Sequence, residues 1–287
     1  MAINFFFAIA ICALRVVASP TGLSDEKPAI AHRAFPTNSQ LWPEAKITWC
    51  YEDSDDEIDK DAAVDVIGSA WELWKKALGG KSSLQFVAAD KGDPKCDRAD
   101  ESKLILHIIF NRNDENFASI GYGPKDSYIQ YDYTHFETLY KDPNERAQAR
   151  AAVLAHELGH TLGLEHEHQK PSAWAKVGGK LKLNCENVEG YQSLSDKGLN
   201  MDELCSDRKK ALEAGFAAHN LLPLDASKGT DDGSFDWDSI MLYPSFFFAQ
   251  EPGKFTMVKR DPDGGFIEPN FVPSARDAKA VINMYPN

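Results

Sequence analysis

Three histidines and one glutamate fall within residues 156–166, which read HELGHTLGLEH. On an α-helix, His156 and His160 stand about one turn apart on the same face, so both imidazoles can reach a single metal ion. Gly163 favours a left-handed turn at the end of that helix, which would bring His166 back as a third ligand. Three neutral ligands leave one coordination position open, as in catalytic zinc sites. The stretch therefore predicts a site for one zinc ion per chain.

Glu157 follows the first histidine and lies to one side of the ligand face. Its carboxylate is expected to reach a water molecule at the ion and to act as a general base. The alternative interpretation is a surface helix with two solvated histidines, because short patterns of this kind match by chance. The glycine and the third histidine at their offsets favour the metal site.

A second motif, FDWDSIMLYP, occupies residues 235–244. Together with the histidine stretch, it resembles the Met-turn of the metzincin zinc proteases, and the resemblance implies that Met241 forms an apolar floor beneath the metal. Taken alone, Met241 would more often be an ordinary core residue. Tyr243, two residues further on, matches the Ser-Ile-Met-x-Tyr form of the astacins. That match implies a tyrosine that stabilises the transition state. Whether it also binds zinc at rest is left open, and a buried tyrosine bonded to the backbone is the alternative.

The resemblance to astacins covers about residue 40 to the end of the chain. The run HEHQKP at residues 166–171 is similar to the astacin run His-Glu-His-x-Arg-Pro, with lysine for arginine. In astacins the glutamate after the third histidine, here Glu167, pairs with the amino group that removal of a propeptide frees. Cleavage after Arg33 would supply such an amino group. Glu167 as a solvated loop acid is the alternative, and neither is preferred. The usual zymogen motif Phe-x-Gly-Asp is missing, which indicates a divergent member.

The N-terminal residues predict that the protein is secreted. An apolar run over residues 5–14 is too short to span a bilayer, and small residues follow it, so residues 1–18 are predicted to be a secretory signal peptide. Residues 19–40 are expected to be a leader or short propeptide, and residues 41–287 a metalloprotease catalytic domain. Its upper subdomain is predicted over about 41–166 and its lower subdomain over about 167–287.

Four cysteines remain after the predicted signal peptide: Cys50, Cys96, Cys185 and Cys205. In a secreted chain they indicate two disulfides with three possible pairings. The pairs Cys50–Cys96 and Cys185–Cys205 are preferred because each closes a loop within one subdomain. A formal charge of −13 and an isoelectric point near 5.1 argue against nucleic acid and anionic membranes as partners. A monomer is expected.

The elements that must hold the site follow from periodicity. Strands are predicted at residues 46–51, 84–88, 104–110, 118–123 and 128–133, with His107 as a core histidine. A helix near residues 63–78 stops at Gly79-Gly80, and a longer helix runs from the cap Asp142 to Leu162. Further helices are predicted near residues 207–218 and from Ser274. This order resembles the metzincin upper lobe.

The resemblance implies an α+β metzincin zincin fold. Such a fold has a twisted mixed β-sheet and two long helices above an irregular C-terminal lobe with a terminal helix, and the active-site cleft lies between the lobes. Residues 118–122 would form the antiparallel edge strand that binds an extended protein or peptide substrate by strand addition. The sequence thus predicts a secreted zinc endopeptidase. Its main rival is a catalytically weak secreted binding or effector protein that keeps the fold and the metal.

Overall fold

The computed structural model describes residues 40–53, 58–96, 105–112, 116–123, 127–134, 136, 140–229, 231–261 and 265–287. The predicted signal peptide and nearly all of the predicted leader therefore lie outside the described residues. Five strands form the main sheet in the order β2-β1-β3-β5-β4. They are β1 (Lys46–Asp53), β2 (Gln85–Ala88), β3 (Ile105–Asn111), β4 (Phe117–Ala118) and β5 (Tyr128–Asp132). Only β4 runs antiparallel to its neighbour, β5.

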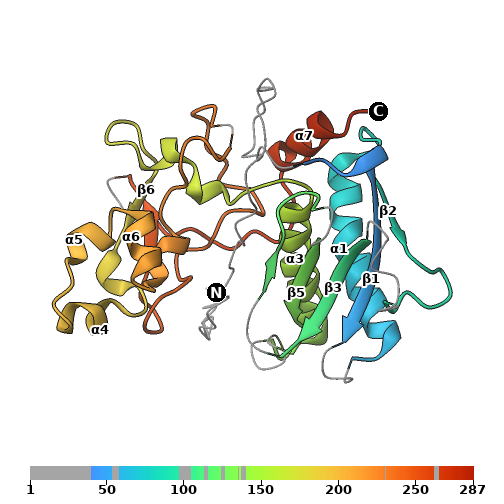
Figure 1. The fold of residues 1–287 in the computed structure, drawn as a ribbon, viewed down its shortest axis with the longest axis horizontal. Coiled ribbons are helices and arrows are strands. Elements are labelled where there is room, and N and C mark those ends of the chain that lie inside the picture. The colour runs from blue at the N-terminus through green and yellow to red at the C-terminus, as the bar shows by residue number, and fades with distance from the viewer. Residues whose placement is uncertain are drawn as a thin grey trace, which may run out of the picture.

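Two long helices cover one face of this sheet (Figure 1). Helix α1 (Lys60–Leu78) begins at the Asp59 cap and ends at Gly79, which adopts the left-handed conformation. Helix α3 (Pro143–Thr161) begins at Asp142, whose side chain accepts hydrogen bonds from two backbone N–H groups of the first turn. The helices lie side by side, and the indole of Trp74 on α1 donates to the carbonyl of Ala155 on α3 at 2.8 Å. This contact fixes α3 one residue before the first predicted zinc ligand.

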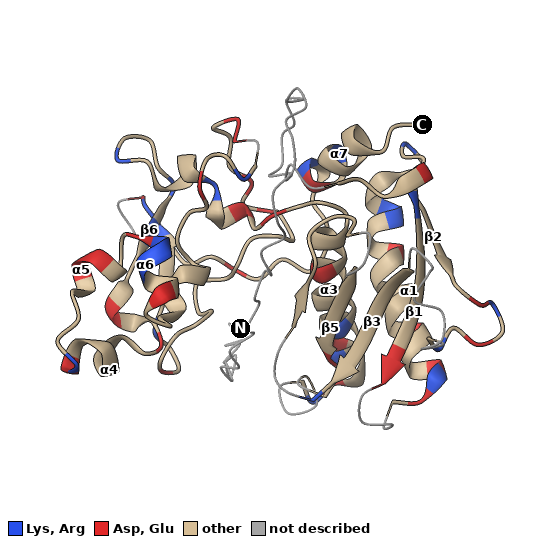
Figure 2. Cartoon of the chain, viewed as in Figure 1, with Lys and Arg blue, Asp and Glu red and all other residues tan. Residues whose placement is uncertain are grey.

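The residues after α3 form an irregular lobe beside the sheet (Figure 1). It contains short helices α4 (Tyr191–Asp196), α5 (Met201–Leu204) and α6 (Arg208–Glu213), and a two-stranded sheet of β6 (Leu181–Leu183) and β7 (Met257–Lys259). Short 3-10 turns cover Glu167–Gln169, Pro171–Trp174, Cys185–Asn187 and Ala217–Asn220, and a further one, Pro43–Ala45, precedes β1. Acidic and basic side chains occur on both lobes (Figure 2). Each lobe has its own apolar core.

The last helix, α7 (Ala275–Met284), returns the chain to the lobe that contains the main sheet and lies near α1 (Figure 1). We call this lobe the upper lobe and the irregular lobe the lower lobe. Ser274 caps α7 as predicted. The single helix predicted near residues 207–218 is instead α6 followed by the turn at residues 217–220, because Gly215 adopts a φ of 65° between them. Within the described residues, no helix combines the length and the apolar character that a membrane crossing needs.

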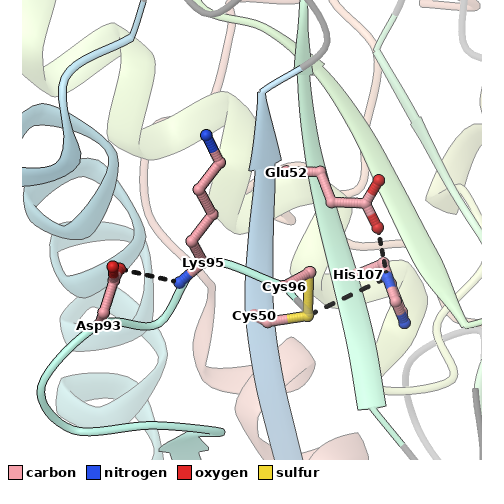
Figure 3. Close-up of a disulfide and its surroundings, with 6 residues drawn as sticks. All are labelled: Cys50, Glu52, Asp93, Lys95, Cys96 and His107. Carbon is pink, nitrogen blue, oxygen red and sulfur yellow. Dashed lines mark hydrogen bonds and ion pairs between the residues drawn. A yellow bond between two sulfur atoms is a disulfide. The ribbon is translucent and has the colours of Figure 1, made fainter. Parts of the chain in front are cut away.

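Both preferred disulfides, Cys50–Cys96 and Cys185–Cys205, are present. The first lies beside His107, whose Nδ1 is 2.5 Å from the Glu52 carboxylate and 4.0 Å from Cys50 Sγ (Figure 3). The prediction of a core histidine is wrong here, because 38% of the His107 side chain is exposed. The reason is strand alternation: His107 points to the side of β3 opposite the buried Leu106 and Ile108. The disulfide keeps both sulfur atoms from acting as metal ligands.

Candidate metal centre

Helix α3 and the turn that follows it bring the three predicted ligands together. His156 and His160 occupy successive turns of α3, and Gly163, with a φ of 105°, reverses the chain so that His166 returns to them. The Nε2 atom of His166 lies 3.2 Å from Nε2 of His156 and 3.1 Å from Nε2 of His160. These separations are close to the roughly 3.3 Å that separates nitrogen ligands around a tetrahedral zinc ion with Zn–N bonds of about 2.0–2.1 Å.

The other ring nitrogen of each histidine donates a hydrogen bond. Nδ1 of His156 donates to the Ile240 carbonyl at 2.7 Å, and Nδ1 of His160 donates to the Leu164 carbonyl at 2.8 Å. Nδ1 of His166 donates to the Gln169 side-chain oxygen at 3.1 Å. Because a carbonyl oxygen can only accept, the proton of each neutral ring sits on Nδ1 and the Nε2 lone pair is free.

These bonds make the centre suited to a cation. Burial lowers the pKa of His156 to about 4 and of His160 to about 3, and holds the pKa of His166 well below its usual value. Three neutral rings therefore direct lone pairs at one point, an arrangement that repels itself unless a positive ion lies between them. The donor set of three imidazoles and an open side fits catalytic zinc.

Two further predicted residues lie at this centre with polar atoms that have no hydrogen-bond partner among the described residues. Glu157 is fully buried, and neither carboxylate oxygen forms a hydrogen bond. Tyr243 is 1% exposed, its hydroxyl has no partner, and its ring centroid lies 4.3 Å from that of His166. Burial raises the pKa of both groups well above the usual values, and the Glu157 carboxylate adds to the rise at Tyr243. A cation held by the histidines would oppose the rise at Glu157.

The Met-turn lies directly beneath α3. Met241 is 1% exposed and packs where Gly159 leaves room, because a Cβ at Gly159 would stand only 2.4 Å from the Met241 sulfur. A glycine inside a helix costs stability relative to alanine, so this one has a packing reason. The role of Gly159 was not predicted, although a glycine between two ligands of a helix is a signal that could have suggested it.

Two other carboxylates hold the Met-turn in place. Asp277 on α7 accepts from the Ser239 hydroxyl at 2.7 Å and from the Ile240 backbone N–H at 2.9 Å. Glu167, next to His166, accepts from the Asp236 backbone N–H at 2.8 Å and from the Lys170 ammonium at 2.9 Å. Burial raises the pKa of Glu167, and the Lys170 ammonium opposes that rise. Neither Asp277 nor Lys170 was predicted to contribute to the site.

A pocket of about 80 Å³ opens beside His156. It lies between α3, the Met-turn and the segment at residues 269–271, and apart from His156 its lining contains no acidic or basic side chain. The apolar lining residues include Val153, Ile240, Leu242, Pro244, Phe247 and Phe271. An apolar side chain fits such a pocket better than a charged one.

The predicted edge strand borders the same region. β4 is antiparallel to β5 at the margin of the sheet. It is shorter than predicted, because Gly121 turns with a φ of 65° and its N–H donates to the carbonyl of the ligand His160 at 2.9 Å. The chain that follows β4 is thus hydrogen-bonded to α3.

Comparisons with known proteins agree with this geometry. The family model described as Matrixin (Peptidase_M10) matches residues 41–195. Astacin-like metalloprotease toxin 1 of Loxosceles intermedia is 24% identical over 133 residues, which are 46% of this chain and 37% of the toxin. Astacin-like metalloprotease toxin 5 of Loxosceles gaucho is 28% identical over 99 residues, which are 34% of this chain and 38% of the toxin. The matches thus span well under half the length of these curated relatives.

Solved structures share the fold at low sequence identity. High choriolytic enzyme 1, a hatching enzyme zinc-protease from Oryzias latipes, aligns with a TM-score of 0.52 and 15% identity over 86% of this chain and 92% of the enzyme. Myroilysin aligns with a TM-score of 0.53 and 15% identity over 88% of this chain and 99% of its own. These likenesses support the architecture, and the site itself is defined by the residues described above.

Proposed function

This chain belongs to the matrixin-type family of metzincin zinc proteases, and we propose that it is a secreted endopeptidase in which Glu157 is the general base. The observation that carries the proposal is the meeting of three Nδ1-protonated histidines with the unpartnered carboxylate of Glu157 in one buried centre. Two disulfides support an oxidising compartment outside the cytosol.

His156, His160 and His166 would hold a zinc ion, which would supply Lewis-acid chemistry by polarising a carbonyl and lowering the pKa of a water molecule toward about 7. Glu157 takes the proton of the attacking water and later delivers it to the leaving amine. Because both of its carboxylate oxygens lack protein partners, they are available for that water. The Tyr243 hydroxyl, also unpartnered, donates to the oxygen on which negative charge develops.

The substrate is proposed to be a protein or peptide bound in extended form. Among the described residues, β4 has a strand neighbour on one side only, which leaves its other margin for strand addition by a peptide. The apolar pocket beside His156 then receives one apolar side chain next to the scissile bond. Both features support an endopeptidase that selects uncharged residues at that position.

Glu157→Gln tests the proposal against the rival binding or effector protein. The amide cannot accept the proton of water, so hydrolysis of a peptide library should fall about 10²–10⁴-fold while zinc content stays at one per chain. Elemental analysis and turnover are measured on the same preparation. Glu145→Gln, on the exposed first turn of the same helix, is the matched control and should keep wild-type turnover. Equal activity of the Glu157 variant and the wild type would remove the general base. A wild type that binds zinc without turnover would favour the rival.

A further inference from the structure

Glu167 and Lys170 form an ion pair that is closed off from water. The Lys170 Nζ to Glu167 Oε1 distance is 2.9 Å, and the exposed fractions of the two side chains are 0% and 2%. Removing two charges from water is expensive, and such pairs add little to stability over an apolar pair of similar size. Stability alone therefore does not explain why a lysine ammonium is buried against the carboxylate that follows a predicted metal ligand in the chain. Its position does.

The pair lies where three segments of the site meet. Glu167 directly follows the ligand His166, and its backbone N–H donates to the Met241 carbonyl at 3.0 Å. Its carboxylate also accepts from the Asp236 backbone N–H. The Lys170 ammonium donates in addition to the Ser234 carbonyl at 3.3 Å. These bonds join the segment that carries the third histidine to residues 234–241. That stretch includes Ile240, whose carbonyl orients His156.

We propose that Lys170 is a positioning residue whose ammonium is the built-in countercharge of Glu167, and that the zinc centre therefore assembles without an amino group from a cleaved chain terminus. This inference rests on the proposed function and names how the same site is regulated. Glu167 Oε1 already accepts from the Lys170 ammonium and from the Asp236 backbone N–H, so an incoming ammonium would have to compete with both donors for that oxygen. The resemblance to astacins implied a freed amino group at this glutamate, whereas here a side chain three residues away occupies it.

Charge variants test the positioning role. Lys170→Met keeps much of the volume but leaves a buried carboxylate without its countercharge. Zinc affinity, measured by competition with a chelator, should fall about 10–100-fold, as it does when groups that orient metal ligands are lost. The absorption spectrum of the cobalt-substituted protein should change as the ligands shift. Lys170→Arg should restore both readouts, and the double variant Glu167→Gln/Lys170→Met, which buries no charge, should restore them in part. Lys176→Met, at an exposed lysine of the same lobe, is the control.

Variants of the chain terminus test the second half of the proposal. Three proteins are compared: one beginning at Ser19, one beginning at Ala34, and one beginning at Ala34 with its amino group acetylated. The free and acetylated Ala34 forms should have the same zinc affinity and cobalt spectrum, and the same kcat/KM within about twofold. A tenfold advantage of the free amine, or Lys170→Met indistinguishable from wild type, would overturn the inference. A protein without peptidase activity would contradict the proposed function. Zinc affinity and the cobalt spectrum would still test the role of Lys170, because neither measurement requires turnover.

Discussion

Tyr243 combines a tightly packed ring with an unpartnered hydroxyl. Its ring is fixed between His166 and His168, at centroid distances of 4.3 and 4.4 Å, and it is nearly inaccessible to solvent. Its hydroxyl nevertheless has no hydrogen-bond partner in the protein. A buried hydroxyl without a partner costs folding free energy, so we expect its partner to arrive with the substrate.

Tyr243→Phe should therefore lower kcat by about 10²-fold or more with little change in KM, because a donor used only in the transition state is lost. The melting temperature should stay the same or rise slightly, since no protein hydrogen bond is broken. Steady-state kinetics and thermal unfolding measure the two effects. Tyr191→Phe, on the half-buried start of α4, serves as a control. Wild-type kcat in Tyr243→Phe would make this tyrosine a core residue only.

At the residue scale, the sequence predicted the three histidine ligands but not the groups that orient their rings. Spacing alone identifies two histidines on one helical face and a third after a glycine. The acceptors of their Nδ1 protons include the backbone carbonyls of Ile240 and Leu164, and every residue carries such a group. Lys170 was noted only as a substitute for arginine, because its partner depends on how the chain folds back.

Among the elements, α7 has a larger role than its terminal position suggests. Ser274, predicted as the cap of this helix, forms a capping box in which Asp277 is the second member. The Asp277 carboxylate also holds Ser239 and Ile240 of the Met-turn, and burial raises its pKa to about 6. One carboxylate thus caps a helix of the upper lobe and fixes the turn beneath the metal.

The raised pKa makes the stability contribution of Asp277 depend on pH. The folded protein holds the Asp277 proton up to about pH 6, while the unfolded chain releases it near its ordinary value of 3.8. The contribution of Asp277 to the free energy of unfolding should therefore be fully present at low pH and be lost as pH rises from about 4 to 6, a change of up to roughly 3 kcal/mol.

Asp277→Asn removes this titration and keeps an oxygen for the Ile240 N–H. The difference in unfolding free energy between wild type and variant should shift in favour of the variant as pH rises through this window. Urea unfolding of both proteins at several pH values measures it, and effects common to both, such as loss of zinc in acid, cancel. A constant difference between pH 4 and 7 would contradict the expectation.

Element prediction followed periodicity and chain length. The long amphipathic helices α1 and α3 were predicted from their caps and apolar stripes. The short helices α4 and α5 were not, because four to six residues carry too little periodicity. The disulfide Cys185–Cys205 constrains this region. β4 overlaps the strand predicted at residues 118–123 only at Ala118, and the chain then turns at Gly121, whose N–H donates to the His160 carbonyl.

In the whole molecule, the metal centre lies at the junction of two cores. Leu158 and Met241 belong to the core of the upper lobe, whereas Leu242 and Tyr243 belong to that of the lower lobe. His156 and His160 come from the helix of the upper lobe, and His166 begins the passage into the lower one. The architecture could be predicted because two motifs identify a known family, while the packing of the lower lobe has no comparable signal.

Removal of zinc should therefore loosen the junction as well as abolish hydrolysis. Three converging lone pairs would be left facing one another, and the binding free energy would be lost from the folded state. With free zinc about 1,000-fold above the dissociation constant, the loss is about 4 kcal/mol. Calorimetry of the zinc-loaded and chelator-treated protein should show a lower melting temperature for the second, and added zinc should reverse it. An unchanged melting temperature, with zinc loss verified by elemental analysis, would show that zinc does not stabilise the junction between the two cores.

The hold of Asp277 on the Met-turn has a consequence for biosynthesis. The histidines and Glu157 leave the ribosome first, and α7 follows much later in the same chain. Until α7 emerges, Ile240 lacks the carboxylate that fixes it, and the Ile240 carbonyl is not yet set to orient His156. A nascent chain thus carries all three histidines before it carries the carboxylate that fixes the Met-turn, so we expect an ordered metal centre only after α7 has been made.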